Sequence, residues 1–167
     1  MAHQPIEQQK WEGKASANLI GTTADQVWLL CGDFLGIHKW LRGIDTCELA
    51  EGVPGQPGCV RYVSSTMIPT DGSDEAKFSW AKEKLLSIDT IQRCITYEVI
   101  ESNIGFNSYV ATIKVVSEDQ GGSKIEWSYV VDPIKGWKFE DFVSFIDFFV
   151  HSMAKSIEET LEVEASK

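Results

Sequence analysis

The sequence is poor in cysteine, and the few cysteines that it has are scattered. Four occur in 167 residues, with no Cys-x-x-Cys pair, at Cys31, Cys47, Cys59 and Cys94. No histidine lies at zinc-finger spacing from them, and the chain has no glycine-rich phosphate-binding loop. We therefore expect reduced, buried thiols, and we expect neither a metal nor a nucleotide cofactor.

Positive charge is also scarce, and long apolar runs are absent. The chain has 15 Lys and Arg against 25 Asp and Glu, for a formal net charge of −10. An acidic protein is repelled by phosphate backbones and by anionic lipid, which disfavours nucleic acid as a partner. No segment of about 18 apolar residues occurs, and no basic start precedes an apolar run at the N-terminus. We expect a cytoplasmic protein with no stable membrane insertion.

The sequence does contain a series of short segments in which apolar and polar residues alternate. Alternation with period two is typical of strands that bury one face. The segments are residues 10–19, 46–50, 58–63, 78–85, 95–100, 109–115 and 124–131. Turn formers separate them, as in Asp119-Gln120-Gly121-Gly122-Ser123, so neighbouring strands should pair as antiparallel hairpins. The pattern predicts an antiparallel sheet of about seven strands.

Helical segments flank this series of strands. Thr23 and Gln26 have the spacing of a capping box that opens a short helix, and a second short helix is expected over residues 33–41. Residues 137–161 have the 3.6-residue apolar period of a long helix. We expect its sheet-facing side to carry Phe142, Ile146, Phe149, Met153 and Ile157.

The order of these elements indicates the α+β class, with a curved antiparallel sheet wrapped on the long C-terminal helix. A chain of this length can bury roughly two-thirds of its unfolded surface, which is enough for a core and an internal pocket. We expect residues 1–9 to form a disordered tail and residues 10–164 to form a single ligand-binding domain.

Arg61 and Glu83 lie on two neighbouring predicted strands. Period two places Arg61 on the same face as Val63 and Ser65, and it places Glu83 on the same face as Ser79. The two charged side chains can therefore face each other. The alternation is compatible with a solvated ion pair, worth at most about 1 kcal/mol, and with a buried pair inside a pocket.

Four aromatic residues have the parity of inward-facing side chains on the last three strands. They are Tyr97, Tyr109, Trp127 and Tyr129. A sheet that curves around a helix leaves space between the two layers, and such pockets are mostly apolar with a few polar groups. Aromatic side chains are also ordinary core material. These residues either line a pocket or fill the core.

The element order, with Trp11-Glu12-Gly13-Lys14 at its start, resembles the helix-grip fold of the START-like, Bet v 1-like, polyketide cyclase and lipid-transport superfamily. Residues 58–63 read Gly-Cys-Val-Arg-Tyr-Val, and residues 80–85 read Trp-Ala-Lys-Glu-Lys-Leu. These two motifs are similar to those of the plant lachrymatory-factor synthases. The sequence departs from that family in a longer loop at residues 68–77 and in Phe149, where a tryptophan is expected.

The resemblance implies a cofactor-free isomerase with Arg61 and Glu83 as its catalytic residues. In that chemistry an alkenylsulfenic acid, supplied by an alliinase-like enzyme, becomes a thial S-oxide by net transfer of a proton from oxygen to carbon. Arg61 would bind the sulfenate oxygen and Glu83 would relay the proton. The implied substrate-binding residues are Tyr97, Tyr109, Trp127, Tyr129 and Phe149.

The alternative is a non-catalytic carrier or receptor of a small apolar ligand, such as a lipid, a hormone or a polyketide-like molecule. Arg61 and Glu83 would then anchor a polar head group. Hormone receptors of this superfamily close over their ligand with Ser-Gly-Leu-Pro-Ala and His-Arg-Leu loops, and neither string occurs here. This absence weakens the receptor hypothesis and leaves the carrier hypothesis unchanged.

Overall fold

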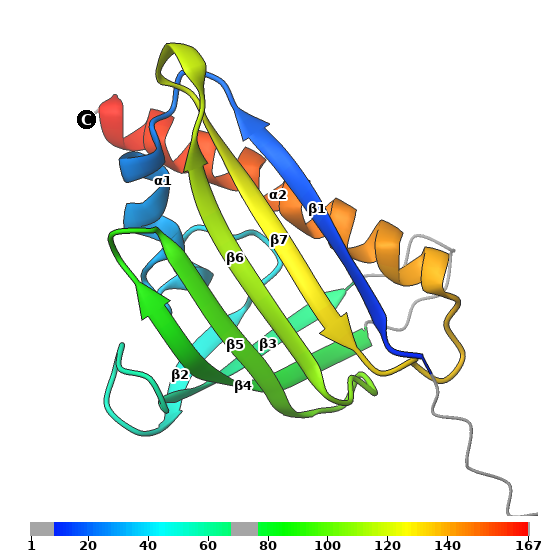
Figure 1. The fold of residues 1–167 in the computed structure, drawn as a ribbon. Coiled ribbons are helices and arrows are strands. Elements are labelled where there is room, and N and C mark those ends of the chain that lie inside the picture. The colour runs from blue at the N-terminus through cyan, green and yellow to red at the C-terminus, as the bar shows by residue number, and fades with distance from the viewer. Residues whose placement is uncertain (1–8, 68–76, 167) are drawn as a thin grey trace, which may run out of the picture.

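An antiparallel sheet curves around one long helix in the computed structural model, which describes residues 9–67 and 77–166 (Figure 1). Within these residues the sheet has seven strands in the order β1-β7-β6-β5-β4-β3-β2. Their bounds are β1 Trp11–Leu19, β2 Thr46–Glu51, β3 Val60–Met67, β4 Lys77–Asp89, β5 Cys94–Ser102, β6 Tyr109–Ser117 and β7 Ser123–Val131. Every neighbouring pair is antiparallel. The predicted fold class, a helix-grip α+β architecture, is confirmed.

The first short helix, α1 (Ala24–Cys31), begins where its capping box predicts. The Thr23 hydroxyl accepts a hydrogen bond from the Gln26 backbone N–H at 3.2 Å, and the Gln26 side chain accepts one from the Thr23 N–H at 2.9 Å. These two bonds satisfy backbone donors that have no partner inside the helix.

The prediction of a second short helix over residues 33–41 is wrong in length. The structure has only a 3-10 turn, η1 (Ile37–Lys39), preceded by Gly36 in a non-helical conformation. In an α-helix the Phe34 carbonyl would accept the backbone N–H four residues later. It accepts a hydrogen bond from the Arg61 side chain instead, so a tertiary contact replaces the helical one.

The C-terminal helix, α2 (Phe139–Ala165), starts two residues later and ends four residues later than predicted. Of its predicted sheet-facing side chains, Phe142, Ile146, Met153 and Ile157 are buried, and Phe149 is half-buried. Trp137 lies before the helix and packs its ring against Phe145. Helix α2 packs mainly on β1 and β7, at one side of the curved sheet.

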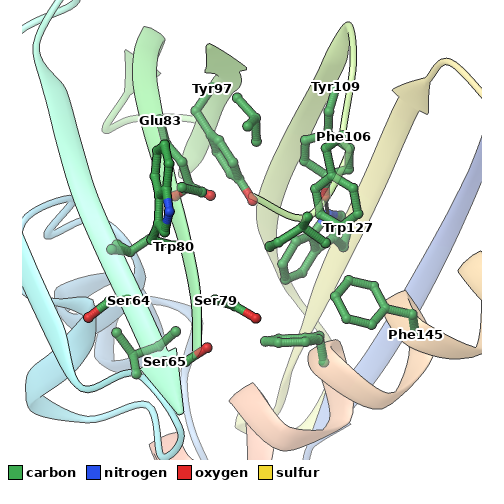
Figure 2. Close-up of a pocket in the computed structure, with 16 residues that line it drawn as sticks. Ser64, Ser65, Ser79, Trp80, Glu83, Tyr97, Phe106, Tyr109, Trp127 and Phe145 are labelled. Atoms are coloured by element: carbon green, nitrogen blue, oxygen red, sulfur yellow. Dashed lines mark hydrogen bonds between the residues drawn. The ribbon is translucent and has the colours of Figure 1, made fainter. Parts of the chain in front are cut away.

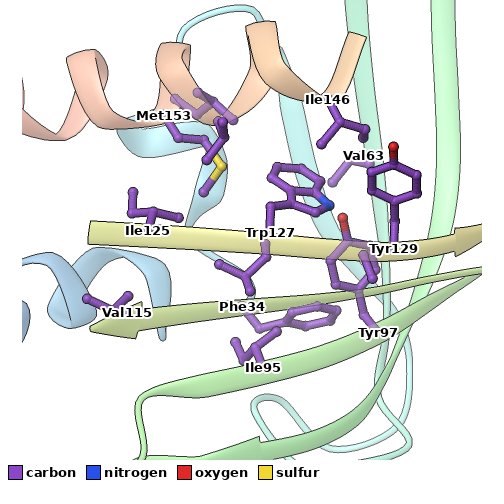
Figure 3. Close-up of a cluster of buried hydrophobic side chains, with 14 of the residues drawn as sticks. Phe34, Val63, Ile95, Tyr97, Val115, Ile125, Trp127, Tyr129, Ile146 and Met153 are labelled. Carbon is purple, nitrogen blue, oxygen red and sulfur yellow. The ribbon is translucent and has the colours of Figure 1, made fainter. Parts of the chain in front are cut away.

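The core lies between the concave face of the sheet and α2. Figure 3 shows buried side chains from both layers meeting there, with Met153 and Ile146 of α2 above Trp127 and Ile125 of β7. The convex face carries ion pairs such as Lys82–Glu101. Because α2 covers the β1–β7 side, the β3–β5 side of the concave face is left with room for a cavity.

Two sequence expectations fall on parts of the chain that the structure does not describe. They are the disordered tail, apart from Gln9, and the lengthened loop up to Lys77, which is itself the first residue of β4. Among the described residues, no helix combines the length and the apolarity needed to cross a membrane.

Candidate functional site

Arg61 on β3 and Glu83 on β4 are directly opposite each other in the sheet register. Arg61 Nε donates a hydrogen bond to Glu83 Oε1 at 2.8 Å. Only 6% of the Arg61 side chain and 13% of the Glu83 side chain are exposed to solvent. Alternation allowed either a solvated ion pair or a buried one, and the structure has the buried pair. A charge-assisted hydrogen bond joins the two side chains.

Arg61 is fixed by three further contacts. Its Nη1 donates to the Phe34 carbonyl oxygen at 2.6 Å. Its guanidinium carbon lies 3.9 Å from the centre of the Phe34 ring and 5.3 Å from the centre of the Tyr97 ring, which are cation–π distances. Phe34 lies in the turn after α1, within the segment where a second helix was expected. This segment binds the Arg61 side chain through the carbonyl and the ring of Phe34.

The main cavity has a volume of about 110 Å³ and lies at the concave face of β3–β6, beside α2. Figure 2 shows Glu83 and Tyr97 along one side, with Tyr109, Phe106, Trp127 and Phe145 across from them. Most of the lining is apolar. Among the described residues that line the cavity, Glu83 is the only one with a charged side chain.

Two tyrosine hydroxyls supply further polar groups. Trp127 Nε1 donates to the Tyr109 hydroxyl oxygen at 3.2 Å. Burial raises the pKa of Tyr97 well above its usual value, and the nearby phenol of Tyr109 and carboxylate of Glu83 raise it further. Burial also raises the pKa of Tyr109. Both phenols therefore stay protonated at neutral pH. Because the two hydroxyls are hydrogen-bonded to each other, one of the two protons remains available for a ligand.

The cavity brings together five of the seven residues named from sequence: Glu83, Tyr97, Tyr109, Trp127 and Phe149. Arg61 is in the site but behind Glu83. It does not line the main cavity; it borders a separate space of about 20 Å³ with Asp33, Trp40 and Phe34.

Tyr129 is not among the lining residues. Its ring packs edge-on against Phe142, with centroids 4.9 Å apart. A Cβ atom added to Gly13 on β1 would lie 2.6 Å from the Tyr129 hydroxyl oxygen, which is too close. This close approach explains why a glycine occurs within the strand. Tyr129 is therefore a core residue, one of the two roles that its parity allowed.

Several lining residues were missed by sequence reasoning. Ser65 and Ser79 share the predicted faces of Arg61 and Glu83, so their parity was a usable signal. Trp80 has the opposite parity, and the register between β4 and β5 shifts at Lys82/Glu83, where β5 has one extra residue that period two does not anticipate. Phe106 comes from the loop before β6, where no periodic pattern exists.

A curved sheet that grips a helix around a mostly apolar cavity defines the class as a Bet v 1-like, helix-grip pocket protein for small ligands. The family follows from a direct match. Residues 15–162 match the model of the family described as polyketide cyclase / dehydrase and lipid transport, and the chain belongs to that family.

Solved structures from bacteria and from a plant are similar to this chain. XoxI from Bacillus cereus is 24% identical with a TM-score of 0.70, covering 92% of this chain and 97% of XoxI. A protein from Thermobifida fusca is 22% identical with a TM-score of 0.68, covering 89% and 93% of the two chains. Ginseng major latex-like protein 151 from Panax ginseng is 25% identical with a TM-score of 0.69, covering 90% and 97%. These matches support the fold, and the bacterial ones give no support to a specifically plant origin.

Proposed function

We propose that this protein is a lachrymatory-factor-synthase-like isomerase that converts an alkenylsulfenic acid into a thial S-oxide by proton transfer. One observation carries the proposal. Among the described residues that line this largely apolar cavity, Glu83 is the only one with a charged side chain, and Arg61 holds it there through a hydrogen bond of 2.8 Å. A positioned carboxylate in an apolar site is suited to general acid–base catalysis.

The reaction needs only one proton to be moved. Glu83 takes the O–H proton of CH3–CH=CH–S–OH and returns it to the carbon that bears the methyl group. The electron pair of the C=C bond forms the new C–H bond, and the electrons of the former O–H bond are redistributed to give C=S and the S-oxide. The product, CH3–CH2–CH=S=O, has the same atoms and oxidation level as the substrate, so no oxidant or reductant is required.

The geometry gives each polar group a separate role in this proposal. Arg61 lies behind Glu83, so it is a positioning residue that orients the carboxylate and stabilises its charge. This replaces the role implied by the resemblance, in which the arginine binds the sulfenate oxygen. In the hydrogen-bonded pair of Tyr97 and Tyr109 hydroxyls, the proton that is not shared between them is the donor proposed to hold the substrate oxygen.

The volume of the cavity favours a small substrate over a lipid. An engineered protein cavity of about 150 Å³ accommodates benzene. At about 110 Å³ the present cavity suits a molecule with few heavy atoms, and 1-propenylsulfenic acid has about five non-hydrogen atoms. A carrier of a long-chain lipid would need a considerably larger space.

The decisive experiment supplies 1-propenylsulfenic acid, generated in place by an alliinase-type enzyme, and measures the thial S-oxide. Wild type should form it, and Glu83→Gln should lower the rate by on the order of 10²–10⁴ because the titrating proton is lost. Arg61→Leu should also lower the rate, because the Glu83 carboxylate would no longer be held in position. If wild type forms no thial S-oxide while still binding apolar ligands, the protein is a carrier; if both variants match an active wild type, the pair is only structural.

A further inference from the structure

The Arg61–Glu83 pair is oriented so that its negative end faces the main cavity. Glu83 lines that cavity, whereas Arg61 borders the separate space behind it. No lysine, arginine or histidine is among the described residues that line the main cavity. A ligand inside it therefore meets a carboxylate without meeting a cation directly.

Arg61 cannot readily turn towards a ligand. Its Nε and Nη1 are bonded to Glu83 and to the Phe34 carbonyl, and its guanidinium is stacked on the Phe34 ring. If Arg61 turned away, the Phe34 carbonyl oxygen and the Glu83 carboxylate would lose their hydrogen-bond donor inside the protein. Leaving buried groups unpaired costs more free energy than breaking the same contacts at an exposed site, where water replaces the donor. The orientation of the pair is thus a fixed property of the site.

The remaining polar groups of the cavity match a neutral ligand. Glu83 accepts hydrogen bonds, and the hydroxyls of Tyr97, Tyr109, Ser65 and Ser79 can donate them. A ligand with one O–H or N–H donor and one acceptor atom satisfies both kinds of group. A carboxylate ligand satisfies only the hydroxyl donors and places a second negative charge beside Glu83, where the apolar lining screens it poorly.

We infer that this cavity selects small neutral ligands bearing an O–H or N–H donor and rejects anions of the same shape. The binding preference stands on the cavity alone. Its consequence for the reaction rests on the proposed function: the substrate must enter as the sulfenic acid and not as the sulfenate anion. The site would then also refuse the fatty-acid type of ligand, whatever the chain length.

Three probes test the inference, all built on the same four-carbon skeleton. Crotyl alcohol replaces the sulfur of 1-propenylsulfenic acid by a methylene group, crotonamide is neutral, and crotonate has the shape of crotonamide with a negative charge. Binding is followed by NMR titration, with the Trp127 indole N–H as a reporter inside the cavity. Wild type should bind crotonamide and crotyl alcohol more tightly than crotonate, by on the order of 10²-fold.

Two variants identify the charge that is responsible. Glu83→Gln should remove the preference or reverse it, because Arg61 then lacks its carboxylate partner. Glu101→Gln removes the same charge from an exposed position on β5 and should keep the preference, which controls for net charge.

The inference is overturned if wild type binds crotonate as tightly as crotonamide, or if none of the probes binds. It is also overturned if Glu83→Gln keeps the full preference. If the Glu83→Gln variant does not fold, the relative affinity of wild type for crotonate and crotonamide still tests the inference. Turnover of 1-propenylsulfenic acid is a separate readout: a protein that discriminates the probes and forms no thial S-oxide contradicts only the proposed function.

Discussion

Replacing Arg61 with leucine should destabilise the protein far more than replacing a charge on the convex face. The change leaves Glu83 as an unpaired carboxylate that is only 13% exposed, and it leaves the Phe34 carbonyl without its donor. Two unit charges about 4 Å apart attract by about 4 kcal/mol at an effective dielectric constant of 20. Removing one partner of a buried pair costs about 3–5 kcal/mol in comparable proteins. We expect Arg61→Leu to fall in that range.

The measurement is urea unfolding at pH 7, followed by tryptophan fluorescence and by circular dichroism. Glu101→Gln is the matched control, because Lys82 and Glu101 form an ion pair between β4 and β5 with side chains 41% and 59% exposed. Its loss should cost at most about 1 kcal/mol. If Arg61→Leu does not fold, Arg61→Lys retains the charge and loses the forked geometry, and it should still cost more than the control.

A double-mutant cycle separates the pair from its surroundings. Arg61→Leu with Glu83→Gln removes both charges, so the double variant should be less destabilised than the sum of the single variants, by roughly 0.5–3 kcal/mol. Strict additivity, or a cost for Arg61→Leu no larger than that of the control, would refute the argument that burial couples these two residues.

Three further predictions concern the scaffold. Phe142→Ala should lower the free energy of unfolding by about 3–5 kcal/mol in urea denaturation, because that ring is fully buried. Thr23→Ala should cost about 0.5–2 kcal/mol through loss of the α1 cap, measured in the same way, whereas Thr23→Ser should cost little. Because the folded pKa values of Tyr97 and Tyr109 are raised above the unfolded value of 10.0, the contribution of these two residues to stability should be full below about pH 10 and should be lost as the pH rises above it. Phenolate absorbance should show both tyrosines ionising last, and ionisation of every tyrosine near 10 would contradict this.

The secondary structure followed from the sequence wherever a local pattern specified it. Alternation located the strands, and the apolar period located α2 to within a few residues at each end. The Thr23–Gln26 capping box gave the start of α1 because both of its hydrogen bonds lie within four residues of chain. The helix expected over residues 33–41 failed where a partner 27 residues away, Arg61, took the carbonyl of Phe34.

The candidate site was determined by sequence only in part. Parity and strand order allowed Arg61 to face Glu83, and the register of the sheet shows that the two residues are directly opposite each other. Period two relates residues on one face to each other, but it does not say which face is covered or how deeply. That depends on α2 and on the turn after α1, which pack on the strands from distant parts of the chain.

The tertiary structure alone decided what the cavity presents to a ligand. Tyr109 and Tyr129 have the same predicted parity, yet Tyr109 lines the cavity and Tyr129 packs under Phe142. Arg61 and Glu83 are neighbours, yet only Glu83 reaches the cavity. A cavity is the small difference between the space that the sheet and helix enclose and the volume of the side chains that fill it. Its shape and the sign of its charge therefore depend on contacts between residues far apart in the sequence, which no local pattern records.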